Sequence, residues 1–228
     1  MLKGITLGRG GYSKVYLVCH NNKEYACKVM SKSPRALKEI AISLELQKVP
    51  GVIKVHDVYD CENNYYIVME RCKKISTDYM QRNIKPFLHN TLSILSYIHD
   101  NDIIHNDIKL DNIMMGNDNK LRIIDFGCSL YANDPIPSLS QTTPVYCSVE
   151  SLRSETCKKS DIWSIGVMSF YLLTNKLPFD GNSVNEIFKE ILMHTPNFDL
   201  ITDLDGKNFV MACIDACLRC EQPKASLT

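Results

Sequence analysis

Four side chains near the middle of the chain have the types and spacing needed to handle a phosphoryl group. Asp107, Lys109 and Asn112 lie close together, and Asp125 follows thirteen residues after Asn112. An aspartate can orient a hydroxyl, a lysine can offset phosphate charge, and an asparagine with a second aspartate can hold magnesium. The spacing therefore indicates phosphoryl transfer, with Asp107 and Lys109 at the reacting group and Asn112 and Asp125 at the metal.

Two regions of different character must position these groups. Residues 1–70 are predicted to be mostly strands around one helix, which begins at Pro34 after the N-cap Ser33 and runs to about Gln47. This helix has two apolar sides, so we expect it to be packed between other elements. One side carries Leu37, Ile40, Ala41 and Leu44, and the other carries Ile42 and Leu46. Beyond residue 73, helical spacing predicts helices near 87–98, 161–173, 184–193 and 208–219, with the polar motifs on loops between short strands in 103–127.

Composition narrows the functional class. The chain has 228 residues, with 26 basic and 26 acidic side chains, and this balance argues against a dedicated binder of nucleic acid or anionic membrane. Its 10 cysteines are scattered and no signal peptide is evident, which favours reduced thiols in the cytoplasm or nucleus. The longest apolar stretch, 162–173, is shorter than the roughly twenty residues of a membrane span, so we expect a buried helix.

A glycine-rich segment and a lysine precede the central motifs. Gly8 to Val15 lies between two predicted strands, where glycines let backbone amides approach a phosphate closely. Lys28 lies on the next apolar strand, where it is either a surface lysine with a buried stem or a phosphate-binding cation held by a carboxylate. Glu39, eleven residues later, is the preferred partner, and Glu45 is the alternative.

Four segments together carry a resemblance to a known family. His105 to Asn112 resembles HRDLKxxN, Asp125-Phe126-Gly127 is DFG, Thr143 to Glu150 resembles TPxYxAPE, and Asp161 to Gly166 resembles DxWSxG. In this order they resemble the eukaryotic-type serine/threonine protein kinases, nearest to the calcium/calmodulin-dependent and calcium-dependent groups. The short chain is also similar to compact kinases of viruses or parasites. The resemblance covers essentially the whole chain.

The resemblance implies a fold and an organisation. It implies an α+β bilobal kinase fold, with a small antiparallel sheet and one main helix in the N-lobe and a larger, mostly helical C-lobe. We expect a single kinase domain over 1–228, divided into an N-lobe (1–70), a hinge (71–73) and a C-lobe (74–228) that stops near the family's last helix.

The resemblance also implies a site. Asp107, Lys109, Lys28 and Glu39 would be catalytic, and Asn112 and Asp125 would bind Mg²⁺, for which Mn²⁺ could substitute. His105 would be a packing residue. The ATP-binding positions would be Leu7, Gly8, Gly10, Gly11, Ser13, Val15, Ala26, Lys28, Met69, Glu70, Cys72, Met114 and Asp125.

The implied reaction is transfer of the ATP γ-phosphate to serine or threonine hydroxyls of protein substrates. Lys109 and Thr143 favour this specificity over tyrosine. We expect a monomer that binds neither nucleic acid nor membrane, in the cytoplasm or nucleus, or in a host cell if the chain is virus-encoded.

Asn106 is the departure with the clearest consequence. Most regulated members carry an arginine before the catalytic aspartate, and it pairs with a phosphate on the activation loop. Asn106 is neutral, so we expect activity that does not require phosphorylation of Ser138, Ser140, Thr142 or Thr143.

Other departures favour an alternative function. Ser13 replaces the third loop glycine, and Ser148 and Val149 replace Ala-Pro. Ala225 stands where an arginine would pair with Glu150, which leaves Glu150 unpaired or paired with Lys224 or Arg153. The alternatives are a pseudokinase that acts as a nucleotide- or partner-binding module, and a small-molecule kinase, against which the 143–150 segment argues.

The cysteines at 213, 217 and 220 have the spacing of an iron–sulfur motif. They fall in a helical apolar pattern and lack an obvious fourth ligand for zinc, so we interpret them as helix residues and not as a metal site.

Overall fold

The computed structural model describes residues 5–11, 13–134 and 142–218. The chain forms two compact units, each built from separate stretches of sequence. The first comprises Met1–Ile75, Asn90–Asn101 and Asp111–Ser129, and the second comprises Ser76–His89, Asp102–Leu110 and Leu130–Thr228. The long helix α3 (Ile84–Asp100) therefore contributes to both units.

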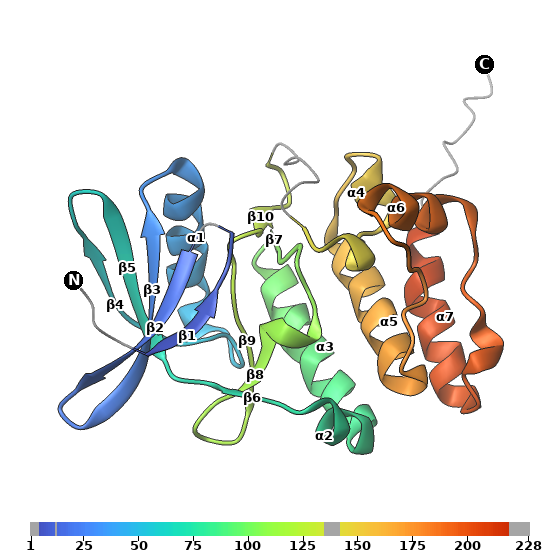
Figure 1. Cartoon of the computed structure of the whole chain (residues 1–228), viewed down its shortest axis with the longest axis horizontal. Coiled ribbons are helices and arrows are strands. Elements are labelled where there is room, and N and C mark those ends of the chain that lie inside the picture. The colour runs from blue at the N-terminus through green and yellow to red at the C-terminus, as the bar shows by residue number, and fades with distance from the viewer. Residues whose placement is uncertain (1–4, 12, 135–141, 219–228) are drawn as a thin grey trace. The chain divides into compact units, whose positions relative to one another are not determined.

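An antiparallel sheet dominates the first unit (Figure 1). Its strand order is β1-β2-β3-β5-β4. The strands are β1 (Thr6–Arg9), β2 (Ser13–His20), β3 (Lys23–Ser31), β4 (Val55–Asp60) and β5 (Asn64–Glu70). The turn at Asn21 and Asn22, both with positive φ, joins β2 to β3 as the predicted hairpin.

Helix α1 (Pro34–Glu45) lies against this sheet (Figure 1). Ser33 caps it, as predicted, by accepting a hydrogen bond from the Ala36 amide. Ala36 and Ile40 pack with Met30, Tyr65 and Ile67 of β3 and β5 in one hydrophobic cluster.

The prediction that α1 is packed on both sides is wrong. Leu37 and Leu44 are 52% and 48% exposed. Ala36, Glu39, Ile40, Ile42 and Ser43 are the buried residues of the helix. The helix continues into the 3₁₀ turn η1 (Leu46–Lys48), which buries Leu46.

A smaller antiparallel sheet completes the first unit. It contains β6 (Lys73–Lys74), β8 (Ile113–Met115) and β9 (Leu121–Ile123), in the order β6-β8-β9. Backbone bonds link β9 to the segment after α1, since Ile123 N donates to Gly51 O and Ile53 N donates to Ile123 O. Gly51 has a φ of +85°, and a Cβ there would lie 2.3 Å from Ile94 of α3, so only glycine fits this close approach.

The described part of the second unit is mainly helical. It contains α2 (Thr77–Arg82), α4 (Val149–Leu152), α5 (Lys158–Thr174), α6 (Val184–Met193) and α7 (Leu204–Leu218), with the 3₁₀ turns η4 (Pro144–Tyr146) and η5 (Phe198–Leu200). The strands β7 (Ile103–Ile104) and β10 (Leu130–Tyr131) pair in it. The 3₁₀ turn η2 (Leu110–Asn112) directly precedes β8 and spans the boundary at which the chain passes from the second unit to the first.

Helix α5 forms the centre of this unit's core. Trp163 stacks on Phe179 with ring centroids 5.5 Å apart, and both belong to a cluster with Phe170, Val210 and Ile214. Helices α5 and α7 run side by side (Figure 1). A Cβ on Gly166 would lie 2.9 Å from the Cβ of Cys213, so the glycine permits this close packing.

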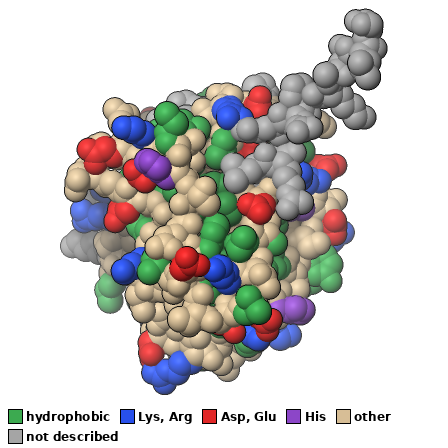
Figure 2. All heavy atoms as spheres, turned by 90° about the vertical axis from the view of Figure 1, so that its right-hand side faces the viewer, with side chains coloured by type: hydrophobic (Ala, Val, Ile, Leu, Met, Phe, Trp, Pro, Cys, Tyr) green, Lys and Arg blue, Asp and Glu red, His purple; other side chains and the backbone are tan. Residues whose placement is uncertain are grey.

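The α+β class predicted from the sequence is confirmed, with α5 and α6 near their predicted bounds and α7 beginning four residues earlier than expected. Within the described residues, no helix is long and apolar enough to cross a membrane. The face that carries α6 and α7 shows hydrophobic side chains between charged ones (Figure 2). The large exposed apolar residues of α6, η5 and α7 are Val184, Leu192, Met193, Leu200 and Leu204.

Candidate active site

Lys28 lies at the centre of a buried charge cluster in the first unit. Its side chain leaves β3 on the sheet face that α1 covers, and its Nζ donates to Oε1 of Glu39 and, at 2.8 Å, to Oδ1 of Asp125. Lys28 and Glu39 are both 6% exposed. The structure thus joins Lys28 to Glu39, the partner predicted in preference to Glu45.

Two opposing effects act on the Lys28 ammonium. Burial by itself would lower the pKa of Lys28, but the charges of Glu39 and Asp125 outweigh it and raise the pKa above its ordinary value. Lys28 is therefore a fixed positive charge at neutral pH. A permanent cation held between two carboxylates is suited to contact phosphate oxygens.

The segment 125–128 is held in place by α1. Asp125 has a φ of +64°, and its Oδ1 accepts from Gly127 N at 3.3 Å. Arg35 Nε donates to Gly127 O at 2.8 Å, and Arg35 Nη2 lies 3.5 Å from Cys128 Sγ. Phe126 is fully buried. The backbone around Asp125 is therefore fixed while its carboxylate stays half exposed.

Asn112 and Asp125 lie at the same end of the β8–β9 ribbon. Ile113 pairs with Ile123 in the sheet, and Ile124 N donates to Asn112 O at 3.0 Å just beyond that pair. Asn112 immediately precedes β8, and Asp125 follows β9 by two residues. Amide and carboxylate oxygens are the ligands that Mg²⁺ takes, so the two residues fit the metal proposed for them.

The predicted adenine-contacting residues include three that share one face of the sheet. Val15 of β2 lies opposite Lys28 of β3, and Met69 of β5 lies opposite Ala26 of β3. Residues directly opposite each other, and residues two apart on one strand, point to the same face, so Val15, Ala26 and Met69 share the face of Lys28. Leu7 and Gly8 are on β1, Gly10 and Gly11 are in the turn before Ser13, and Met114 is on β8.

Glu70 and Cys72 lie at the end of β5 and just beyond it. The Glu70 amide donates to Lys54 O at 2.8 Å, and its carboxylate accepts from Lys54 N and from Arg122 Nε. The Glu70 N–H is therefore already engaged within the first unit. Burial raises the pKa of the Cys72 thiol to about 12, so this side chain is neutral.

In the second unit, Asp161 secures the loop that carries Asp107. Its Oδ2 accepts from His105 N at 2.9 Å and its Oδ1 accepts from Asn106 N at 2.8 Å. Asp161 and His105 are fully buried. Asn106 has a φ of +61°, a conformation that asparagine tolerates better than most residues. One carboxylate on α5 thus fixes two consecutive amides just before Asp107.

Asp107 bonds through its carboxylate to both an ammonium and a hydroxyl. Its Oδ2 accepts from Lys109 Nζ at 2.7 Å, and its Oδ1 accepts from Thr143 Oγ1 at 2.8 Å. Lys109 Nζ also donates to Thr143 Oγ1, at 2.8 Å. A carboxylate, an ammonium and a hydroxyl are therefore mutually bonded, which is an arrangement in which Asp107 can orient a hydroxyl and Lys109 can offset negative charge.

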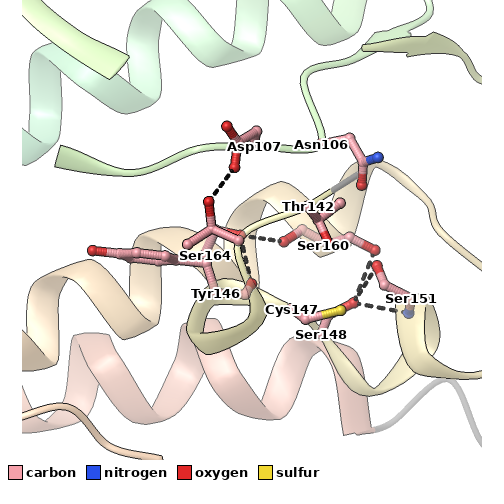
Figure 3. A pocket seen from close by; sticks show the side chains of 10 residues that line it. Asn106, Asp107, Thr142, Tyr146, Cys147, Ser148, Ser151, Ser160 and Ser164 are labelled. Carbon is pink, nitrogen blue, oxygen red and sulfur yellow. Dashed lines mark hydrogen bonds between the residues drawn. The ribbon is translucent and has the colours of Figure 1, made fainter. Parts of the chain in front are cut away.

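A small pocket beside Asp107 is lined mainly by residues whose side chains carry a polar atom (Figure 3). Asn106, Thr142 and Thr143 border it. The other lining residues come from the segment before α4 and from α4 and α5, namely Tyr146, Cys147, Ser148, Ser151, Ser160 and Ser164. Ser148, Ser151 and Ser160 turn toward one another within it (Figure 3).

Glu150 is the described buried carboxylate that lacks a partner. It is 5% exposed, and neither of its side-chain oxygens accepts a hydrogen bond from the described residues. Arg153 therefore does not form the pair considered from the sequence. Lys224 and Ala225 lie outside the described residues, as do Ser138, Ser140 and Cys220.

Several contributing residues were not predicted. Arg35 shares a helix face with Glu39, four residues away, and that spacing is the one signal that could have indicated its contact with the 125–128 segment. The bonds among Ser148, Ser151 and Ser160 had no signal beyond the replacement of Ala-Pro. Of the three cysteines considered as a metal motif, Cys213 is buried in α7. Within the described residues, no three His, Cys, Asp or Glu side chains lie close enough together to hold a metal ion.

Comparison with known proteins identifies the family. The model for the protein kinase domain matches residues 2–219. Calcium-dependent protein kinase 6 of Plasmodium berghei is 31% identical over 86% of this chain, which corresponds to 14% of that protein. Serine/threonine-protein kinase PEPKR2 of Arabidopsis thaliana is 29% identical over 82% of the chain and 43% of the relative.

A third relative is the probable serine/threonine-protein kinase MARK-A of Dictyostelium discoideum, 30% identical over 82% of the chain and 20% of the relative. The chain thus spans less than half the length of each of these relatives. The match extends over nearly the whole chain, including both charge clusters around Lys28 and Asp107. The chain therefore belongs to the protein kinase domain family, of the eukaryotic serine/threonine type.

Proposed function

We propose that the chain is an active serine/threonine protein kinase that transfers the γ-phosphate of ATP to protein hydroxyls. The observation that carries the proposal is the buried Lys28, which donates to both Glu39 and Asp125. Burying a charge is costly unless it is paired, so a chain with no use for a phosphate-binding cation would gain stability from an apolar residue there.

The first unit supplies the groups for nucleotide and metal. Lys28 would contact the phosphates, and Val15, Ala26 and Met69 would line the adenine, whose edge would meet the backbone at Glu70 and Cys72. Asn112 and Asp125 would hold Mg²⁺, which supplies positive charge to the phosphate oxygens. Mn²⁺ has the same preference for oxygen ligands and would substitute.

The second unit supplies the groups for the acceptor. Asp107 would orient the serine or threonine hydroxyl and accept its proton, and Lys109 would offset charge on the transferred phosphoryl group. Both already contact the hydroxyl of Thr143 at hydrogen-bond distance, which supports their ability to bind a hydroxyl.

We further propose that this activity does not need a phosphate on the activation loop. Asn106 cannot form the ion pair that an arginine at this position would form with such a phosphate. The test is specific activity before and after treatment with a phosphatase, with removal of phosphate verified by mass spectrometry. Equal activities support the proposal, and a collapse after treatment contradicts it.

The competing function is a pseudokinase that binds nucleotide or a partner without transfer. Departures that favour it include Ser13, Asn106 and the altered pair at 148–149. The retention of Lys28, Asp107, Asn112 and Asp125 favours activity. The two are separated by incubating the protein with labelled ATP, Mg²⁺ and a generic basic protein, beside Asp125→Ala. Label transfer that is lost in the variant supports the kinase. Absence of transfer, with normal thermal stabilisation by nucleotide, supports the pseudokinase.

The proposal includes a monomer that works in the cytoplasm or nucleus, or inside a host cell if a virus encodes it. The even balance of 26 basic and 26 acidic residues supports independence from nucleic acid and membranes. Sedimentation of the purified chain at working concentration checks the monomer, and a shift to a dimer mass would contradict it.

A further inference from the structure

We propose that the hydrogen bond between Ser148 and Ser160 is a charge-free latch that holds residues 143–151 in the arrangement needed for protein substrate. This deepens the proposed function and rests on it. It assigns a positioning role to two serines, of which Ser148 departs from the family's Ala-Pro. The latch would take the part that an arginine–phosphate pair plays in regulated relatives.

The first part of the latch is the position of Ser148. Its Oγ accepts from Ser151 N at 3.1 Å and so caps the short helix α4. The same oxygen lies 3.0 Å from Ser151 Oγ and donates to Ser160 Oγ at 3.1 Å. Ser148 is 1% exposed. A single hydroxyl thus fixes the start of α4 and joins it to the first turn of α5 (Figure 3).

The second part is the position of Ser160 within α5. Its Oγ also accepts from Cys157 N at 3.1 Å, so the hydroxyl is oriented by its own helix. The next residue, Asp161, holds the amides of His105 and Asn106. The first turn of α5 therefore anchors residues 143–151 through Ser160 and the loop before Asp107 through Asp161. These two anchors are adjacent in sequence and rigidly related.

Two further contacts tie the same segment. Ser164, one turn after Ser160, donates to Tyr146 O at 3.0 Å, and Thr143 donates to Asp107 Oδ1. Residues 143–151 are thus held at Thr143, Tyr146 and Ser148, by hydroxyl groups in each case. The bonds that Ser160 and Ser164 of α5 make with Ser148 and Tyr146 join neutral groups. A segment held in this way needs no phosphate to keep it in position. Bonds between buried neutral groups are also little affected by salt.

The chemistry of the cluster also distinguishes a latch from simple packing. Position 148 is buried, and the family pattern has an alanine there. An alanine would fill most of the same volume and would need no hydrogen-bond partner. The Ser148 hydroxyl instead accepts from Ser151 N and donates to Ser160 Oγ, which also accepts from Cys157 N. Their shared bond links residues twelve apart in sequence, so it constrains the segment and not only one helix end.

The test compares Ser148→Ala and Ser160→Ala with the wild-type full chain and with Ser169→Ala as the matched control. Ser169 is a fully buried serine of α5 whose hydroxyl, among the residues that the structure describes, bonds within the helix to Ile165 O. We expect kcat/KM for a protein substrate to fall about tenfold in each latch variant, with an unchanged KM for ATP and no fall in the control. We expect the double variant to be no worse than about the larger single effect, because the two changes remove the same bond.

Backbone hydrogen exchange gives a readout that does not require activity. We expect amides in 142–152 to exchange at least about fivefold faster in Ser148→Ala than in Ser169→Ala, with α7 unchanged in both. Unaltered exchange in 142–152 and unaltered kcat/KM for protein substrate would overturn the latch, as would strictly additive effects of the two substitutions. If the wild type transfers no phosphate, the proposed function fails, and the exchange result still decides whether the latch exists.

Discussion

The hydroxyl of Thr143 donates to Oδ1 of Asp107 at 2.8 Å while it accepts from Lys109 at the same distance. This relationship joins the 143–151 segment directly to the two side chains proposed to act on the acceptor hydroxyl. It means that the position of Asp107 and the position of the segment are coupled through one oxygen atom.

Replacing Thr143 tests this coupling. Thr143→Val keeps the shape but removes the hydroxyl, so Asp107 and Lys109 each lose a partner, and we expect kcat to fall by about 10²-fold. Thr143→Ser retains the hydroxyl and is the matched control, with activity within about threefold of the wild type. Steady-state kinetics at saturating ATP measure both. A valine variant as active as the serine variant would contradict the role assigned to the hydroxyl.

The buried pair of Lys28 and Glu39 leads to a prediction that separates stability from activity. Lys28→Met leaves the Glu39 carboxylate buried without its cation, so we expect the free energy of unfolding to fall by about 3–5 kcal/mol. Adding Glu39→Leu removes the stranded charge and should restore most of that loss, since an apolar pair can replace a buried ion pair.

Phosphate transfer should be lost in both variants, because neither retains the cation. Denaturant unfolding and label transfer are the two measurements. A double variant that regains activity would show that Lys28 has no role with phosphate, and one that stays as unstable as Lys28→Met would contradict the stranded-charge explanation.

Asp161 should be needed in its carboxylate form. Asp161→Asn presents one acceptor oxygen to the two amides of His105 and Asn106, so one of these buried N–H groups loses its partner. We expect a loss of about 1–3 kcal/mol in stability. The loop before Asp107 would be less well fixed, so kcat should fall while the KM for ATP stays near the wild-type value. Unchanged kcat with reduced stability would limit Asp161 to a structural role.

Thiol reactivity follows from burial. Burial raises the pKa of Cys72 to about 12 and that of Cys147 to about 11, so both remain protonated at pH 8, and the thiolate fraction grows only as pH rises toward those values. Cys19 and Cys61 are exposed. We expect iodoacetamide at pH 8 to modify Cys19 and Cys61 at least about tenfold faster than the partly buried Cys72 and the buried Cys147, as measured by mass spectrometry of digests. Labelling of Cys72 at the rate of Cys61 would contradict the burial described for it.

Features set by local sequence were the most predictable. The cap at Ser33, the hairpin at Asn21 and Asn22, and the extent of α6 all follow from residues within a few positions of one another. The order of motifs around Asp107 and Asp125 indicated the chemistry, because phosphoryl transfer needs those residue types together.

Features that depend on contacts distant in sequence could not be predicted in the same way. The periodicity of α1 correctly showed two apolar sides, but it does not reveal whether a second partner covers Leu37 and Leu44, and these residues are exposed. Arg35 reaches Gly127 across 92 positions, and Ser148 reaches Ser160 through the folding of the segment between them. Such contacts are set by tertiary packing and leave no local pattern.

The measurement that tests the central claim most directly is phosphate transfer from γ-labelled ATP to a generic basic protein by the wild type, beside Asp107→Asn. The substitution keeps the size of the side chain and removes the carboxylate that would orient the acceptor hydroxyl. We predict phosphoserine or phosphothreonine on the substrate with the wild type, and at least about a 10²-fold loss in the variant, which should still be stabilised by ATP and Mg²⁺. Equal transfer by the two proteins, or no transfer by the wild type, would contradict the account.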